Sequence, residues 1–91
     1  MRFGIWYTLP SENFKAAVKR FLETGGMPPE GVKLESRWHA ATAGKGFILA
    51  SSNDPKAVYQ WTASWADVIH FDVSPVLDDN DAQGVLKSLK S

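Results

Sequence analysis

The stretch ESRWHA, residues 35–40, alternates ionisable side chains around a tryptophan. Neighbouring residues of a β-strand point to opposite faces, so Glu35, Arg37 and His39 would share one face and Trp38 the other. Imidazole titrates near neutral pH and can serve as a general base, and a guanidinium can hold a carboxylate or stabilise an enolate. His39 and Arg37 are therefore the candidate catalytic pair. The same groups could instead form a solvated cluster at the rim of a sheet, with Arg37 paired to Glu35 or to an acid of a partner chain.

Aromatic residues elsewhere in the chain could line a pocket for a planar ligand. Trp61 and Trp65 have the spacing of residues on one face of a helix, and Trp38 could join them from a strand. Tyr7 and Tyr59 are the candidate hydrogen-bond donors to a bound molecule. Aromatic side chains at helical spacing more often pack in a core, so the tryptophans could also be purely structural.

Two histidines and a carboxylate, His39, His70 and Asp72, are the ligand types of a non-haem iron site. In the sheet expected below, the strands that carry the two histidines are the opposite edges, roughly 14 Å apart. Metal–nitrogen bonds are about 2 Å long, so one ion cannot reach both within a chain. Cysteine is absent, which excludes thiol catalysis, disulfides and Cys-ligated zinc. We therefore expect no metal site, and a site shared across the seam of a dimer is the alternative.

The apolar pattern predicts strands and helices in alternation. A helix begins with Ser11 as its N-cap and ends at Gly25-Gly26, and a second begins with Asp54 as N-cap and Pro55 in its first turn. The predicted strands cover residues 2–9, 32–40, 46–52 and 68–76, and a short helix, weakened by its glycine, follows in residues 77–91. This order is the ferredoxin-like βαββαβ arrangement of an α+β domain. It predicts an antiparallel sheet in the order 4-1-3-2 with both main helices on one face.

Strict alternation, without bulges, assigns the side chains of the sheet to two faces. The face against the helices would carry Phe3, Ile5, Tyr7, Leu34, Ser36, Trp38, Phe47, Leu49, Ser51, Ile69, Phe71 and Val73. The open face would carry Arg2, Gly4, Trp6, Thr8, Lys33, Glu35, Arg37, His39, Ile48, Ala50, Ser52, His70 and Asp72. Trp6, Ile48 and Ala50 would form an apolar centre on the open face, which favours its burial in a two-fold dimer. A monomer with a solvated face is the alternative.

Length and charge restrict the class of protein further. The 91 residues fit a single domain spanning residues 1–91. Lys plus Arg and Asp plus Glu both number 10, so no basic stripe points to a nucleic-acid partner. The N-terminal stretch MRFGIWYTLP lacks the apolar region and cleavage site of a signal peptide, and no segment approaches membrane-spanning length. We expect a cytoplasmic protein that binds neither nucleic acid nor membrane.

Longer stretches of the chain, RFLETGGMPPEGVKLESRWHA and GFILASSNDPKAVYQWTASWADVIHFDVSPVLDDNDA, are similar to the domain of unknown function 3303 family. The most recognisable pieces are residues 29–32, 37–39, 46–47, 61–65 and 75–78. That family resembles the dimeric α+β barrel superfamily, which includes antibiotic-biosynthesis and haem-degrading monooxygenases, muconolactone isomerases and chlorite dismutase relatives. The resemblance implies a dimeric α+β barrel but no particular reaction. Haem, the cofactor of some such proteins, would lie on the helix side, where neither histidine is expected, so no cofactor is predicted.

Together these observations favour a small homodimer that binds a small organic molecule. A cofactor-independent monooxygenase-like or isomerase-like activity would fit such a protein. The alternative is a structural or regulatory interaction module without chemistry. Specific stabilisation by aromatic or quinone-like ligands would separate the two.

Overall fold

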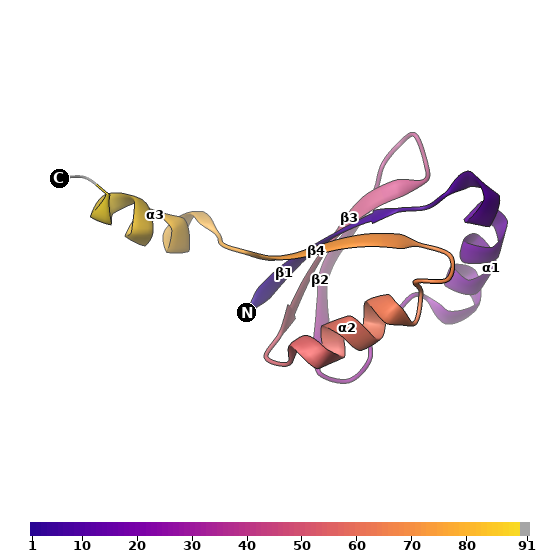
Figure 1. Ribbon diagram of the computed structural model, residues 1–91, viewed down its shortest axis with the longest axis horizontal. Helices are drawn as coiled ribbons and strands as arrows, with labels where there is room; N and C mark the ends of the chain where they lie inside the picture. The colour runs from indigo at the N-terminus through magenta and orange to yellow at the C-terminus, as the bar shows by residue number, and fades with distance from the viewer. Residues whose placement is uncertain (90–91) are drawn as a thin grey trace.

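The strands of the chain form one antiparallel sheet, with helices stacked on one of its faces (Figure 1). The computed structural model describes residues 1–89. Its elements are β1 (Arg2–Thr8), η1 (Ser11–Asn13), α1 (Phe14–Thr24), β2 (Val32–His39), β3 (Lys45–Ser52), α2 (Pro55–Ala63), β4 (His70–Val76) and α3 (Asp79–Ser88). The sheet order is β2-β3-β1-β4, and every neighbouring pair is antiparallel. The α+β ferredoxin-like arrangement and the strand order predicted from the sequence are confirmed; residues 90 and 91 of the predicted tail helix lie outside the described range.

The two main helices begin differently. α2 begins as predicted, since Asp54 Oδ1 accepts a hydrogen bond of 3.0 Å from the backbone N–H of Lys56 and Pro55 occupies the first turn. The prediction of Ser11 as N-cap of the first helix was wrong. Residues 11–13 form a turn of 3₁₀-helix, and α1 starts only at Phe14. The Asn13 amide instead donates to the Val68 carbonyl at 3.3 Å, which ties the start of α1 to the segment after α2.

The core lies between α2 and the centre of the sheet. Its buried members are Phe3, Ile5, Ile48, Ala50, Val58 and Trp61. Because Ile48 pairs with Ile5 and Ala50 with Phe3, these two β3 residues face the helices. The prediction that Phe47 and Leu49 face the helices was therefore wrong. The run GFILA is apolar at successive positions, so its alternation could not distinguish the two faces.

A β-bulge in β2 decides which of its side chains face the helices. Leu34 pairs with Ala50 and Ser36 with Leu49, so Glu35 is an extra residue with no partner of its own. One extra residue turns every later side chain of the strand to the other face.

The consequence is that Arg37 and His39 face the helices, while Trp38 lies on the open face with 65% of its surface exposed. The sequence prediction, which assumed no bulge, placed these residues on the opposite faces and was wrong. Ser36 and Ser51 also lie on the open face rather than the helix face, and Ser51 Oγ donates to the Glu35 carboxylate at 2.9 Å.

The C-terminal helix α3 projects away from the sheet beyond the end of β4 (Figure 1). Its start is fixed by Arg2, whose guanidinium lies 2.7 Å from the Asp78 carboxylate and 3.6 Å from that of Asp81. Further along, Val85, Leu86 and Leu89 are exposed. In the described chain, none of the helices has the length and apolar character needed to cross a membrane.

Candidate functional site

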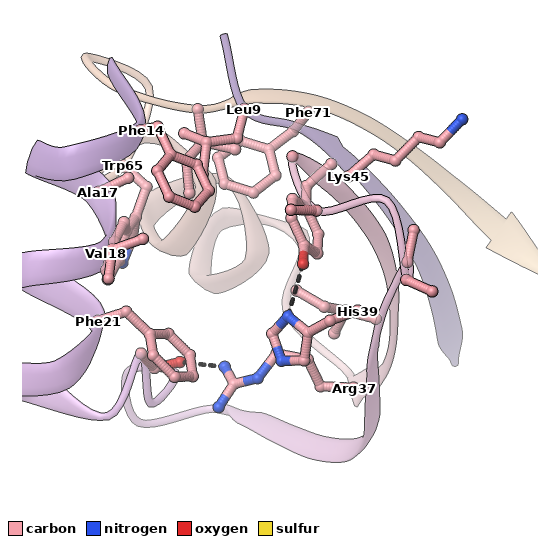
Figure 2. Close-up of a pocket in the computed structure, with 18 of the residues that line it drawn as sticks. Leu9, Phe14, Ala17, Val18, Phe21, Arg37, His39, Lys45, Trp65 and Phe71 are labelled. Carbon is pink, nitrogen blue, oxygen red and sulfur yellow. Dashed lines mark hydrogen bonds between the residues drawn. The ribbon is translucent and has the colours of Figure 1, made fainter. Parts of the chain in front are cut away.

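A cavity of about 430 Å³ separates α1 from the sheet (Figure 2). α1 contributes Phe14, Ala17, Val18 and Phe21, the segment at and after α2 contributes Trp61, Trp65 and Ile69, and the sheet contributes Tyr7, Arg37, His39, Ile48 and Phe71. The β2–β3 turn forms part of the rim. The volume lies within the range of ordinary small-molecule sites, and the lining is largely apolar with a few polar groups at one end.

Polar contacts near the middle of α1 and at its C-terminal end hold this helix over the cavity. Near its middle, Arg20 makes a two-bond ion pair with the Asp67 carboxylate, at 2.9 and 2.7 Å, and donates to the Ser64 carbonyl. At its C-terminal end, Arg37 Nη1 donates to the Gly26 carbonyl at 2.8 Å and Nη2 to the Gly25 carbonyl at 3.0 Å. These contacts hold α1 in place although the cavity beneath it is empty of side chains.

Gly25 and Gly26 allow Arg37 to approach the end of α1. Both have positive φ angles, 76° and 58°, which glycine adopts without strain. A Cβ on Gly26 would lie 3.0 Å from Arg37 Nη1 and 3.0 Å from the Phe21 ring. The guanidinium also stacks on Phe21, with its central carbon 4.7 Å from the ring centroid. Arg37 is therefore held by carbonyls and a ring, and it does not make the ion pair with Glu35 that the rim-cluster alternative predicted.

Tyr7 and His39 meet across the sheet at the polar end of the cavity. The Tyr7 Oη lies 2.7 Å from His39 Nδ1 (Figure 2). These residues are on β1 and β2, and the strand between them places Gly46 opposite both. A Cβ on Gly46 would collide with the Tyr7 ring and the Trp38 carbonyl. The missing side chain at position 46 lets the Tyr7 ring extend over β3 to reach the imidazole.

Burial raises the pKa of the Tyr7 phenol above its ordinary value, and the positive charge of Arg37 acts in the opposite direction. The phenol is therefore protonated at neutral pH. In the tautomer with its hydrogen on Nε2, the imidazole accepts the phenol hydrogen at Nδ1. Burial lowers the pKa of Arg37, with the Tyr7 interaction opposing this, and the guanidinium stays charged at all physiological pH values.

The structure brings together most of the residues that the sequence singled out. Those that line the cavity are Tyr7, Arg37, His39, Trp61 and Trp65. Trp38 and Tyr59 do not: Trp38 is on the open face, and Tyr59 is 75% exposed on α2. The sequence did not identify Phe14, Phe21 or Gly46 as site residues. The two phenylalanines belong to the apolar stripe of α1, a pattern that equally predicts ordinary packing.

Of the proposed metal ligands, His70 and Asp72 project from β4 on the open face, since they pair with Thr8 and Trp6. His39 faces the helices on the far edge strand. Within residues 1–89 no group of His, Asp and Glu side chains is arranged as a metal site.

Comparison with protein families gives a match to the domain of unknown function DUF3303 over residues 1–90. The chain belongs to the DUF3303 family. Comparison with curated proteins gives no match. Among solved structures, the DUF3303 chain is similar to Rv0793 from Mycobacterium tuberculosis, with a TM-score of 0.49 and 14% identity, covering 86% of this chain and 96% of that one.

Deprotonation of Tyr7 should be the main cause of the loss of folding stability at alkaline pH. Its folded-state pKa lies above the ordinary value of 10.0, so at pH values between the two the unfolded phenol has lost its proton and the folded one keeps it. The free energy of unfolding should therefore fall as pH rises through this window. The measurement is urea denaturation across alkaline pH, with phenolate absorption recorded on the folded protein. Tyr7→Phe should remove both this loss of stability and the late phenolate transition.

The chain contains only 2 tyrosines, so Tyr59→Phe is the matched control and should retain both effects. A late transition that survives in Tyr7→Phe and vanishes in Tyr59→Phe would contradict the assignment.

Proposed function

We propose that this DUF3303 protein binds a small, planar organic molecule in the cavity beneath α1. The single observation that supports this most is the composition of the cavity wall: aromatic and aliphatic side chains from α1, from the α2 region and from the sheet, with Tyr7, His39 and Arg37 gathered at one end. A purely structural core would fill such a space, because protein interiors are close-packed. A location in the cytoplasm, favoured by the absence of cysteine, is part of the same proposal.

The Tyr7–His39 pair supports a catalytic form of this function. A ligand proton could pass to Tyr7 Oη while the phenol proton passes to His39 Nδ1, across the 2.7 Å contact. The negative charge left on the ligand would lie near the Arg37 guanidinium, which stabilises an enolate or phenolate. Proton removal of this kind begins both an isomerisation and a cofactor-independent oxygenation. Binding without chemistry is the alternative, and Tyr7→Phe separates the two because it removes the relay and keeps the ring.

Ligand binding can be tested by filling the cavity from α1. Val18 lines it and Ala16, two residues earlier on the same helix, is exposed and does not. Val18→Trp should abolish thermal stabilisation by every binding member of a naphthalene series with charged and neutral substituents, while Ala16→Trp should leave it unchanged. The measurement is the melting temperature against ligand concentration. Loss of stabilisation in both variants, or in neither, would place binding elsewhere. If no compound of the series stabilises the wild-type protein, the proposal is contradicted.

We also propose that the open face of the sheet is the interface of a homodimer, so that two copies form an α+β barrel. Trp6 is 45% exposed on this face, with its ring centroid 4.9 Å from that of Phe47, and Trp38 lies on the adjacent strand. The helices cover only the other face (Figure 1). Such an aromatic patch favours burial against an identical surface, since a two-fold axis brings the same residues together. A regulatory interaction module would use the same face for a different partner.

The dimer predicts a mass of roughly twice the chain mass of 10.1 kDa at micromolar concentration. Trp6→Glu should shift the protein to monomer, because it places a charge in the apolar centre of the interface. Tyr59→Glu, a matched change at an exposed position of α2, should remain dimeric. Light scattering behind size exclusion gives the masses. A wild-type monomer at this concentration, or a Trp6→Glu dimer of unchanged affinity, would contradict the proposed interface.

A further inference from the structure

The polar groups of the described cavity wall are mainly hydrogen-bond donors, and none of them is a carboxylate. Among the lining residues of the described chain there is no Asp or Glu. The positive charge at the cavity is that of Arg37, since the Lys45 ammonium extends away from it (Figure 2). The indole rings of Trp61 and Trp65 can only donate hydrogen bonds. Because the cavity is apolar and partly closed, a positive charge at its wall attracts a bound anion more strongly than it would in water.

The Tyr7–His39 hydrogen bond engages the imidazole acceptor at this end of the cavity and leaves the Tyr7 oxygen as the remaining side-chain acceptor. The imidazole nitrogen with the lone pair, Nδ1, is already engaged by the phenol. The other nitrogen carries the hydrogen and can only donate. With the phenol as donor, the imidazole presents its Nε2–H to a bound molecule.

Arg37 supplies further donors at the same end. Its guanidinium has five N–H groups, of which the structure pairs one on Nη1 with Gly26 and one on Nη2 with Gly25. Figure 2 shows its side chain next to that of His39, on the opposite side of the cavity from Phe14 and Trp65. The cavity therefore has an aromatic end and an end built of donors and positive charge.

From this arrangement we propose that the ligand is a planar aromatic oxyanion, a carboxylate or an ionised phenol, of a size that the cavity of about 430 Å³ can hold. The rings lie in the aromatic end of the cavity, beside Phe14 and Trp65, and the anionic oxygen accepts hydrogen bonds from His39 Nε2 and Arg37. This inference rests on the proposed ligand-binding function and adds the chemical class of the ligand. A cationic molecule finds no carboxylate in the described wall and would be repelled by the Arg37 guanidinium.

The test compares molecules that share a ring system and differ in charge. The probes are 2-naphthoate, 2,4-dinitro-1-naphtholate, 2-naphthylmethanol and protonated 2-naphthylmethylamine, titrated by calorimetry at neutral pH. A charge-assisted hydrogen bond is stronger than a neutral one by about 1 kcal/mol or more, so the anions should bind roughly tenfold more tightly than the alcohol. The ammonium should bind more weakly than the alcohol. The two anions distinguish a carboxylate from a phenolate as the preferred oxyanion.

Variants then locate the anion within the cavity. Arg37→Met keeps a long side chain to stack on Phe21 and removes the charge, and His39→Leu removes the Nε2 donor. Each should reduce the preference for naphthoate over the alcohol to roughly twofold or less. Lys45→Gln is the matched control: Figure 2 shows the Lys45 ammonium extending away from the cavity, so its removal should leave the preference nearly intact. Circular dichroism melting checks that each variant is folded, and His39→Leu serves as the test if the methionine variant is not.

The outcomes separate this inference from the proposed function. If the alcohol binds as tightly as naphthoate, and Val18→Trp abolishes both, the cavity binds aromatic molecules but the oxyanion class is wrong. If naphthoate is preferred equally in wild type, Arg37→Met and His39→Leu, the anion lies elsewhere and the assignment is overturned. If none of the probes binds, the proposed function itself fails.

Discussion

A single extra residue in β2 determines which side chains of this strand face the cavity under α1. Glu35 has no partner on β3, so the strand after it is turned by one position. Without this bulge the guanidinium of Arg37 and the imidazole of His39 would lie on the open face, and Trp38 would occupy the space under α1. With it, the bulky indole moves out of the cavity, and two polar donors replace it. The site and the exposed aromatic patch on the other face are thus two results of one irregularity.

The rest of the site depends on how these side chains are held. Gly46 gives the Tyr7 ring room to cross β3 and reach the imidazole. The guanidinium of Arg37 then binds the two carbonyls that end α1, so the same side chain that charges the cavity also positions the helix above it. Arg20 and Asp67 hold α1 from the α2 side. Because these attachments are polar and peripheral, the helix is fixed while the apolar space below it stays open to a ligand.

Sequence reasoning predicted the order of the elements well, because several boundaries carry a local signal, although the start of α1 at Phe14 was missed. Asp54-Pro55 defines the start of α2, and the paired glycines define the end of α1. The orientation of side chains in β2 and β3 could not be predicted in the same way. A bulge has no strong sequence signature, and β3 is apolar at successive positions, so alternation gave no reliable choice of face. Tyr7 was placed correctly since β1 pairs without a bulge, whereas Trp38 and His39 were exchanged across the sheet.

The most direct test of this description is an aromatic NOESY spectrum of the protein at neutral pH. The imidazole protons of His39 should show cross-peaks to both the Tyr7 and Phe21 rings, whose centroids lie 6.0 and 5.8 Å away. The Trp38 indole should show none to Trp61 or Trp65, because it lies on the other face of the sheet. Cross-peaks from Trp38 to the α2 tryptophans, with His39 lacking contacts to Tyr7 and Phe21, would mean that β2 has no bulge and that the proposed site does not exist.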